Sequence, residues 1–262
     1  MKQLLCIGLC WFAFSHWSLG QNPESTVDLP GDLLWAGVDR PGDLTVVLRT
    51  GEVIKYDKNG KKQGQYRFPL PPTLYDPLDG AQSFFFDRVT NTYGFLDATM
   101  TTENRHPMDP AFAISPWLVC PVLHELWILD AADFNIKKTK LHAAAISLEM
   151  QLKHLPQKQV EDYTFLREYQ NYIFLLDQKS GIHIFNSLGK YVRTEGEPGM
   201  DYFNFLGEEL YYKKGEELIM IDLYSGEKRK ITLSHACRFA LLTDERMYLA
   251  DTRKVTILEY KP

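Results

Sequence analysis

The stretch from Asn171 to Gly196, NYIFLLDQKSGIHIFNSLGKYVRTEG, reads as three short β-strands separated by turns. The first strand, Tyr172 to Leu176, is apolar and rich in aromatic and β-branched residues, and it stops at Asp177 before a polar turn. Ile182 to Phe185 is the second strand, and Asn186 to Lys190 turns the chain into a third. A meander of this size cannot bury both faces of its sheet alone, so it requires copies of itself as neighbours.

Copies of this stretch recur along the chain. Apolar strands that stop at a polar residue before a turn recur at spacings of 38, 43, 47, 37 and 37 residues, a mean period of about 40. A second series of strand ends accompanies the first, and only Asn135 to Leu141 breaks it. Because this period is the length of a four-stranded propeller blade, the sequence predicts an all-β fold, a six-bladed β-propeller. The first series ends at Arg49, Asp87, Asp130, Asp177, Lys214 and Asp251, and the second at Asp57, Asp97, Asn186, Asp222 and Glu259.

An inner strand should precede each strand of the first series, and each candidate contains an aromatic residue. Large rings supply much of the buried area between twisted sheets, so packing between blades is their expected role, with a stacking surface around the channel as the alternative. Pro77 makes the second candidate the weakest, because proline cannot donate to a sheet ladder. The candidates are Leu33 to Val38, Thr73 to Leu78, Ile114 to Cys120, Tyr163 to Arg167, Tyr202 to Leu206 and Cys237 to Leu242, with the rings Trp35, Tyr75, Trp117, Phe165, Phe203 and Phe239.

The quoted stretch resembles an NHL-type repeat. The resemblance is carried by the strand that ends at Asp177, the Ile-x-x-Phe-like strand Ile182 to Phe185 and the turn at Gly189. The third and sixth repeats match this pattern more loosely, and the first, second and fifth depart further. The resemblance implies a six-bladed propeller but not one activity, because propellers serve as binding proteins, lactonases and lyases alike.

The N-terminal 20 residues have the features of a secretory signal peptide. Lys2 precedes an apolar segment from Leu4 to Phe14, and Ser18 to Gly20 gives a small-x-small cleavage pattern. The apolar run is short for a membrane span, and a retained signal anchor is the alternative. We therefore expect a signal peptide at 1–20, a single propeller domain at 21–262, and export to the periplasm or the outer-membrane periphery. A signal that ends before glutamine, on a chain rich in Tyr and Phe, also resembles exported proteins of Bacteroidota.

The last blade lacks an outer strand, because the chain ends after that blade's third strand. Thr26 to Leu29 is a short strand candidate that follows a polar leader, Gln21 to Ser25. We expect the N-terminal segment to supply the missing strand and close the ring. Such closure removes exposed sheet edges that would invite aggregation.

Composition argues against nucleic-acid binding. After cleavage the 242 remaining residues carry 28 basic and 34 acidic side chains, a net charge of about −6, and the basic patches are short. Cys120 and Cys237 survive processing and fall in blades three and six, which lie opposite each other in a ring of six. We therefore expect two buried free thiols rather than a disulfide, and neither thiol has the CxxC spacing of a redox or zinc site.

Three segments depart from the regular repeat. The connection after blade one contains Pro69, Pro71 and Pro72, and we expect a stiff connector, with a docking site for an aromatic-lined groove as the alternative. Thr101 to Pro110 is expected to form a polar loop into blade three. Leu141 to Val160 lies in the longest interval, and an outer strand followed by an ordinary loop is favoured over a short helix or a partner-binding excursion.

The sequence predicts no catalytic, cofactor-binding or metal-binding residues. It contains no HExxH, GxSxG, glycine-rich phosphate loop or EF-hand loop, and the acidic residues of blade two lack the spacing of a calcium loop. Among the histidines, only His124 and His235 lie where a propeller enzyme would gather metal ligands at its channel mouth. Ordinary exposed or hydrogen-bonded histidines are the expected interpretation. The acidic residues in question are Asp76, Asp79, Asp87 and Asp97.

Two classes of function remain. The preferred one is a non-catalytic protein-interaction scaffold of the periplasm or cell envelope, such as a subunit of an outer-membrane assembly or export complex. Its partner would be a membrane-associated protein, and the mature chain would have no span of its own. The alternative is a small-ligand binder or a metal-dependent hydrolase or lyase that uses the central channel, lined by His124, His235 and the inner-strand rings.

Overall fold

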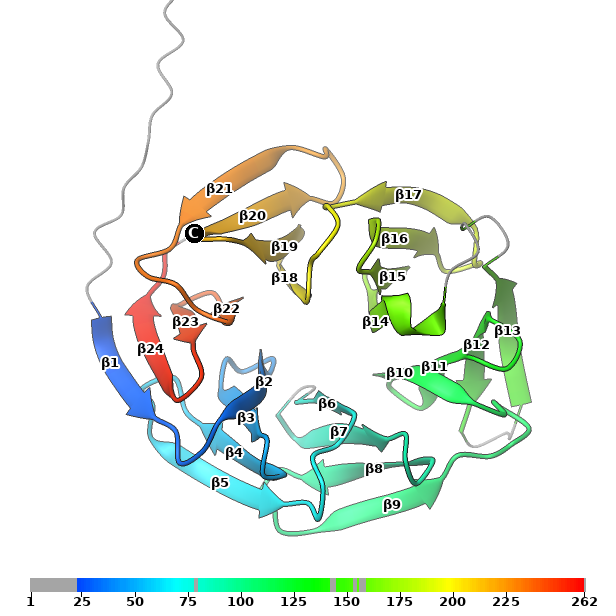
Figure 1. Cartoon of the computed structure of the whole chain (residues 1–262), viewed down its shortest axis with the longest axis horizontal. Helices are drawn as coiled ribbons and strands as arrows, with labels where there is room; N and C mark the ends of the chain where they lie inside the picture. Colours follow the sequence, from blue (N-terminus) through cyan, green and yellow to red (C-terminus); the bar gives the residue numbers. More distant parts are fainter. Residues whose placement is uncertain (1–22, 78–79, 142–144, 153–154, 156–158, 262) are drawn as a thin grey trace, which may run out of the picture.

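The computed structural model describes residues 23–77, 80–141, 145–152, 155 and 159–261. These residues form six four-stranded antiparallel sheets arranged around a central axis (Figure 1). Each sheet is one blade, and in blades one to five the strands follow each other outward in chain order. The fold is therefore a six-bladed β-propeller, as the repeat spacing predicts. The expected signal peptide at 1–20 lies outside the described residues.

The strand bounds agree closely with the repeat. Blade one contains β2 (Leu33–Val38), β3 (Leu44–Leu48), β4 (Glu52–Tyr56) and β5 (Lys62–Arg67), and blade two contains β6 (Leu74–Asp76), β7 (Gln82–Asp87), β8 (Thr92–Asp97) and β9 (Glu103–Pro107). Blade three contains β10 (Pro116–Val122), β11 (Glu125–Asp130), β12 (Asn135–Lys140) and β13 (Ala145–Gln151), and blade four contains β14 (Tyr163–Tyr169), β15 (Tyr172–Asp177), β16 (Gly181–Asn186) and β17 (Tyr191–Glu195). Blade five contains β18 (Phe203–Leu206), β19 (Glu209–Lys214), β20 (Glu217–Asp222) and β21 (Lys228–Thr232), and blade six contains β22 (Phe239–Leu242), β23 (Arg246–Ala250), β24 (Lys254–Glu259) and β1 (Pro23–Asp28).

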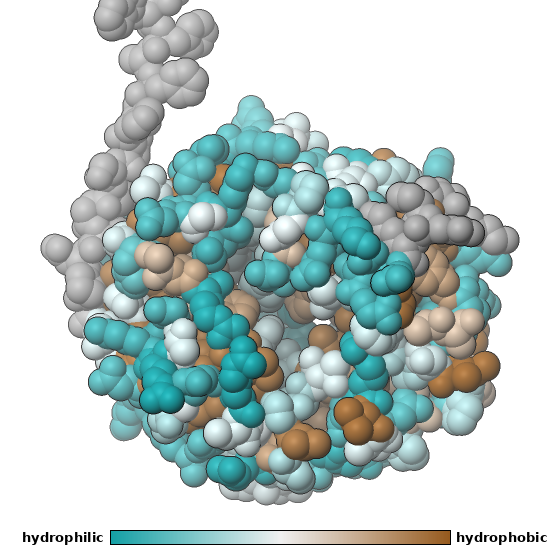
Figure 2. Space-filling view, in the orientation of Figure 1, coloured by the Kyte–Doolittle hydropathy of each residue, from teal (hydrophilic) through white to brown (hydrophobic). Residues whose placement is uncertain are grey.

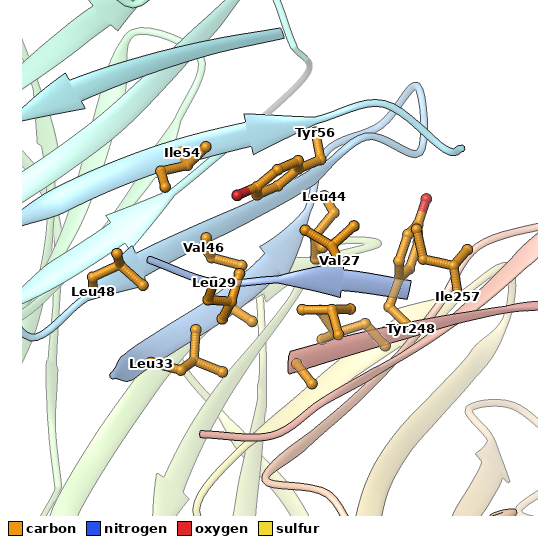
Figure 3. Close-up of a cluster of buried hydrophobic side chains, with 14 residues drawn as sticks. Val27, Leu29, Leu33, Leu44, Val46, Leu48, Ile54, Tyr56, Tyr248 and Ile257 are labelled. Carbon is orange, nitrogen blue, oxygen red and sulfur yellow. The ribbon is translucent and has the colours of Figure 1, made fainter. Parts of the chain in front are cut away.

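Blade six joins the two ends of the described chain. Strand β1 runs antiparallel to β24, with Val27 opposite Val255. The side chain of Val27 is buried in a cluster with Leu44 of β3 and Ile257 of β24 (Figure 3). The N-terminal segment thus supplies the outer strand of blade six, which confirms the expected closure. The strand begins at Pro23, so part of the expected polar leader is already paired.

The polar residues that end the strands hold the turns that follow them. Asp222 accepts backbone N–H bonds from Tyr224 at 2.9 Å and Ser225 at 2.6 Å, and Asn186 does the same for two amides of its own turn. This is the Asx-turn geometry that Asp and Asn favour, and it explains why these residues recur at the strand ends. The same acceptor role falls to Asp57, Asp87, Asp97, Asp130 and Asp177.

The turns open on two faces of the ring, because successive strands are antiparallel. The turns from first to second strand and from third to fourth strand lie on one face, which we call the funnel face. Its first-to-second turns are residues 39–43, 123–124, 170–171, 207–208 and 243–245, together with the turn after β6. The turns from second to third strand and the connectors between blades lie on the other, the connector face, which includes residues 88–91, 131–134, 178–180 and 215–216.

The inner-strand rings pack between neighbouring blades. The ring centroids of Trp35 and Tyr75 lie 6.1 Å apart across blades one and two, and those of Phe165 and Phe203 lie 5.0 Å apart across blades four and five. The indole N–H of Trp117 donates a 2.9 Å hydrogen bond to a backbone carbonyl of blade four. Packing between blades is thus confirmed as the main role of these rings.

The segment Thr101 to Pro110 differs from the expectation. It contains β9, the outer strand of blade two, rather than a polar loop. Its sequence is polar because an outer strand faces water along one edge, and Pro107 is tolerated because it stands at the end of such an edge strand. A polar outer strand gives no hydrophobic signal, which is why the sequence pattern did not reveal it.

Other segments agree with the favoured interpretation or need small corrections. The interval Leu141 to Val160 contains the outer strand β13, and a short 3-10 helix, η1 (Val160–Asp162), then leads into β14. Residues 142–144, 153–154 and 156–158 lie outside the described part. Asn135 to Leu141 contains β12, a regular third strand, although it lacks the usual terminal Asp or Asn. Strand β6 ends at Asp76, so Pro77 interrupts no pairing.

The proline-rich connector after blade one is anchored at its start. Phe68 is buried, and its N–H donates a 2.9 Å hydrogen bond to the carbonyl of Gly51 in the turn between β3 and β4. The side chain of Leu70, in contrast, is 67% exposed on the connector face. The anchored start fits the expected stiff connector.

Candidate functional site

The channel along the axis is nearly filled by side chains. Arg167 of β14 forms an ion pair with Asp76 of β6, two blades away. Burial opposes the charge of Arg167, but Asp76 together with Cys120, Tyr202 and Tyr169 outweighs it, so the pKa of Arg167 lies above its ordinary value. With the surrounding rings, including Trp35 and Phe165, the pair leaves a cavity of about 20 Å³. That is room for about one water molecule, not for a small-molecule ligand.

A funnel of about 770 Å³ opens on the funnel face, with Arg167 at the boundary between it and the narrow channel. All six blades contribute to its wall. Its volume lies within the range of about 300–1,000 Å³ that is typical of binding sites. Figure 2 views the ring from the connector face, so the funnel opens on the side away from the viewer. The lining includes Arg40, Phe95, Leu123, Tyr169, Phe205 and Asp244.

The wall of the funnel is apolar over blades three to five. Leu123 of blade three and Leu206 of blade five contribute aliphatic side chains. Tyr169 stacks on Phe205, with ring centroids 4.1 Å apart and planes 7° apart. Tyr224 lies next to them on the same face, and its hydroxyl donates a 2.8 Å bond to Gln170. This half of the funnel therefore offers apolar and aromatic surface with a few polar groups, the composition of protein-binding sites.

The wall is charged over blades six and one. Lys58 and Glu245 form a 2.6 Å ion pair between the two blades. Behind them Lys55 bridges Asp39 at 2.8 Å and Asp43 at 3.3 Å. Burial alone would lower the pKa of Lys55, but these two carboxylates raise it above its ordinary value. The funnel thus joins an apolar half to a half in which both signs of charge are present.

Leu123 is costly to the fold in two separate ways. Its backbone is left-handed, with φ 48°, and its side chain is 89% exposed. Blades one and five place glycines, Gly42 and Gly207, at positive φ in the corresponding turns. A leucine in this left-handed conformation costs about 1 to 2 kcal/mol of backbone strain. Because its side chain is exposed, it gains no hydrophobic stabilisation from burial. Blade four also places non-glycine residues, Gln170 and Asn171, at positive φ in its corresponding turn.

The structure does not bring His124 and His235 together. His124 lies in the turn between β10 and β11 and lines the funnel. His235 lies in the connector between β21 and β22, on the opposite face, where its ring nitrogens are 3.0 Å from the Ser234 hydroxyl and 3.3 Å from the Thr256 hydroxyl. The alternative that placed both at one channel mouth is therefore wrong in its geometry. Within the described ranges no group of three or more His, Cys, Asp or Glu side chains is placed to hold a metal ion.

The acidic residues of blade two are dispersed as well. Asp76 pairs with Arg167 in the channel. Asp87 and Asp97 end successive antiparallel strands, so they lie on opposite faces of the ring. Asp79 lies outside the described residues. These carboxylates therefore do not form one cation site.

Cys120 and Cys237 are buried free thiols, as expected. Blades three and six lie on opposite sides of the ring (Figure 1). Burial raises the pKa of Cys120 to about 12 and that of Cys237 to about 11, so both remain protonated and poorly reactive at neutral pH. Cys120 lies in β10, whereas Cys237 lies just before β22 rather than within it.

Blade four brings together a serine, a histidine and an aspartate that no sequence motif indicated. Nε2 of His183 lies 3.1 Å from both the Ser180 hydroxyl and Oδ2 of Asp177, and Nδ1 lies 2.8 Å from the Thr194 hydroxyl. A nucleophilic triad needs the serine and the carboxylate on different ring nitrogens and the serine open to substrate. Here both are on Nε2, and Asp177 and His183 are buried. The network joins three strands of the blade and has a structural role.

A second, smaller cavity of about 220 Å³ lies on the connector face, between blades five and six. It is formed by the connector into β18, the turn after β19 and the start of β22. Tyrosines, two lysines and an arginine are prominent in its wall. No sequence pattern indicated it, because its residues come from three segments far apart in the chain. The lining includes Glu197, Asp201, Tyr212, Lys213, Lys214 and Arg238.

Comparison with known proteins supports the fold. No family model and no curated protein matches this chain. BamB from Moraxella catarrhalis aligns over 92% of this chain and 100% of that chain, with a TM-score of 0.51 and 11% identity. A chain in the crystal structure of the mitotic checkpoint complex aligns over 100% of this chain and 99% of that chain, with a TM-score of 0.60 and 10% identity. At such identities the similarity shows a shared propeller fold.

None of the helices in the described part of the chain is long and apolar enough to cross a bilayer.

Proposed function

We propose that this protein is an exported, non-catalytic interaction module of the periplasm or cell envelope. Its partner is a membrane-associated envelope protein, which binds in the funnel, and the two belong to an outer-membrane assembly or export complex. The signal-peptide pattern at 1–20 supports export. One of the two similar propellers is a chain of the mitotic checkpoint complex, which supports a binding role for this fold by analogy.

The observation that carries the proposal is Leu123. A strained backbone and a fully displayed leucine at the mouth of a large funnel are both unfavourable for the isolated protein. Strained backbone conformations of this kind cluster at binding and switching sites. There, favourable contact with a ligand offsets the free energy of the strain. An apolar side chain of a partner packed against Leu123 and the Tyr169–Phe205 stack would bury this surface, and the charged half would set its orientation.

The enzymatic alternative has less support. Its two candidate ligands, His124 and His235, lie on opposite faces, and the middle of the channel is filled. The one serine–histidine–aspartate group among the described residues has the wrong arrangement for a nucleophile. The interaction module needs none of these features.

The test is purification of the tagged protein from its native envelope in mild detergent, with mass spectrometry and the stoichiometry of whatever co-purifies. The wild type should retain a stoichiometric membrane-protein partner, and Leu123→Gly should reduce its recovery at least tenfold. Leu70→Gly is the matched control, because it removes an exposed leucine from the connector face. A wild-type protein that purifies alone, or a partner lost with Leu70→Gly but kept with Leu123→Gly, would contradict the proposal.

A further inference from the structure

The cavity on the connector face carries positive charge that the fold does not neutralise. Its wall contains Lys213, Lys214 and Arg238, against the carboxylates of Glu197 and Asp201, a net charge of +1. The chain as a whole carries a net negative charge, so a positively charged cavity wall differs from it in sign. It is also small: about 220 Å³ is below the range of drug-sized ligand sites.

The neighbouring basic residues of blade five are paired with carboxylates. Lys214 lies 2.5 Å from Glu197, Arg229 lies 2.6 Å from Glu209 and Lys230 lies 2.9 Å from Glu217. Lys213 and Arg238 differ from them, since neither has a carboxylate partner among the described residues. Lys213 and Arg238 both line this cavity.

Both cations contact neutral groups, and Lys213 is partly buried whereas Arg238 is exposed. Nζ of Lys213 donates a 3.1 Å hydrogen bond to the carbonyl of Gly215. The guanidinium of Arg238 donates to the carbonyl of Leu33 and lies 5.6 Å from the ring centre of Phe239. An ammonium has three N–H donors and a guanidinium has five, so each retains donors and its full charge after these contacts. Fixed donors of positive charge are the groups that bind carboxylates and phosphates.

From this arrangement we propose that the cavity between blades five and six binds a small oxyanion, a carboxylate or a phosphate, between Lys213 and Arg238. The anion supplies the counter-charge that the protein lacks there. The rings of Tyr202 and Phe239, with centroids 5.9 Å apart, form the wall against which the organic part of the ligand packs. Asp201 and Glu197 restrict the anion to the side of the cavity away from their carboxylates, because like charges repel. This site is separate from the funnel and does not rest on the proposed partner.

The test is titration of the purified full chain, followed by calorimetry and by amide NMR shifts, at constant ionic strength in chloride. The probes are inorganic phosphate and succinate, which distinguish a phosphate site from a carboxylate site. Saturable binding of at least one probe is expected, with shifts in residues 197–202, 213–216 and 237–240. Saturation by neither probe would overturn the proposal.

Variants locate the site. Lys213→Met should weaken binding at least tenfold, and Arg238→Met should do the same. Lys254→Met is the matched control, because Lys254 is an exposed lysine of blade six on the same face but outside the cavity. Lys213→Arg keeps the charge and should bind within threefold of the wild type. Equal binding by wild type and Lys213→Met, with the melting temperature unchanged, would overturn the assignment, whether or not the funnel partner is retained.

Discussion

The funnel face and the connector face use the same device, an Asp at a strand end, in different surroundings. On the connector face, Asp130 and Asp177 end second strands and are buried. On the funnel face, Asp57, Asp97 and Asp222 end third strands and remain partly in water. Connectors between blades contact the first group: Ile114 and Ser115 donate to Asp130, and Gln178, next to Asp177, donates to the carbonyl of Asp162. At Asp130 and Asp177 the connector face is therefore more tightly packed than the funnel face is at its third-strand ends, whereas Asp87, which also ends a second strand, is only partly buried.

Asp130 illustrates how a connector covers the end of a second strand. Its carboxylate accepts N–H bonds from Ile114 at 3.0 Å and Ser115 at 2.9 Å in the incoming connector, and it lies 2.8 Å from Nζ of Lys137. Burial alone would raise the pKa of Asp130, but these bonds outweigh it and hold the pKa below its ordinary value. One side chain thus joins two strands and the connector that covers them.

The largest effect should come from removing β1, the strand that closes the ring. Deleting residues 21–31 removes β1 and opens blade six, because β24 then loses its outer neighbour and Val27 leaves the core. We expect the melting temperature to fall by about 10 °C or more, relative to a chain that begins at residue 21, in a calorimetric scan. An unchanged melting curve would show that the ring does not depend on this closure.

A smaller but clear difference should separate the two kinds of Asp. Asp130→Ala leaves Lys137 buried with only Asp133 as a partner, so we expect a loss of about 3 kcal/mol in the free energy of unfolding. Asp222→Ala removes an equivalent Asx turn on the funnel face, and its loss should be several-fold smaller. Urea unfolding with an unchanged m-value measures both. Equal losses would remove the distinction between sealed and open turns.

Asp97, at a strand end on the funnel face, should make the stability of the fold depend on pH. Hydrogen bonds from the Thr99 hydroxyl and from the amides of Thr102 and Thr101 hold the pKa of Asp97 at about 2. A depressed pKa contributes stability above the unfolded value of about 3.9, and this contribution disappears as the pH falls towards 2. Asp97→Asn keeps the acceptor, as Asn186 does in blade four, but cannot titrate. Its urea midpoint should match the wild type at pH 7 and fall less steeply between pH 4 and pH 2; parallel curves would contradict the assignment.

The smallest effect on stability should come from Leu123→Gly. Glycine adopts a φ of 48° without strain, which offsets the entropy that glycine loses on folding, and an exposed leucine contributes no core packing. We expect a free energy of unfolding within about 1 kcal/mol of the wild type, measured in urea. A large loss would mean that Leu123 serves the fold rather than a partner.

The sequence predicted the ring well because strand ends carry a chemical signal. Asp177 and its counterparts recur since Asx turns need them, and the missing strand of blade six pointed to the N-terminal segment. Strand β9 was missed because polar outer strands carry no apolar pattern. The two cavities were missed for a different reason: the funnel and the cavity between blades five and six combine residues from different blades. His124 and His235 lie apart because their turns open on opposite faces, which the strand-end pattern does not reveal.

Hydrogen exchange of the protein with and without its co-purified partner tests the central claim most directly. If the partner occupies the funnel, exchange should slow in the turns at 123–125, 207–209 and 243–246. The connector-face turns at 88–91 and 131–134 should exchange at the same rate in both samples. Slowed exchange confined to the connector-face turns, with the funnel-face turns unchanged, would contradict the account.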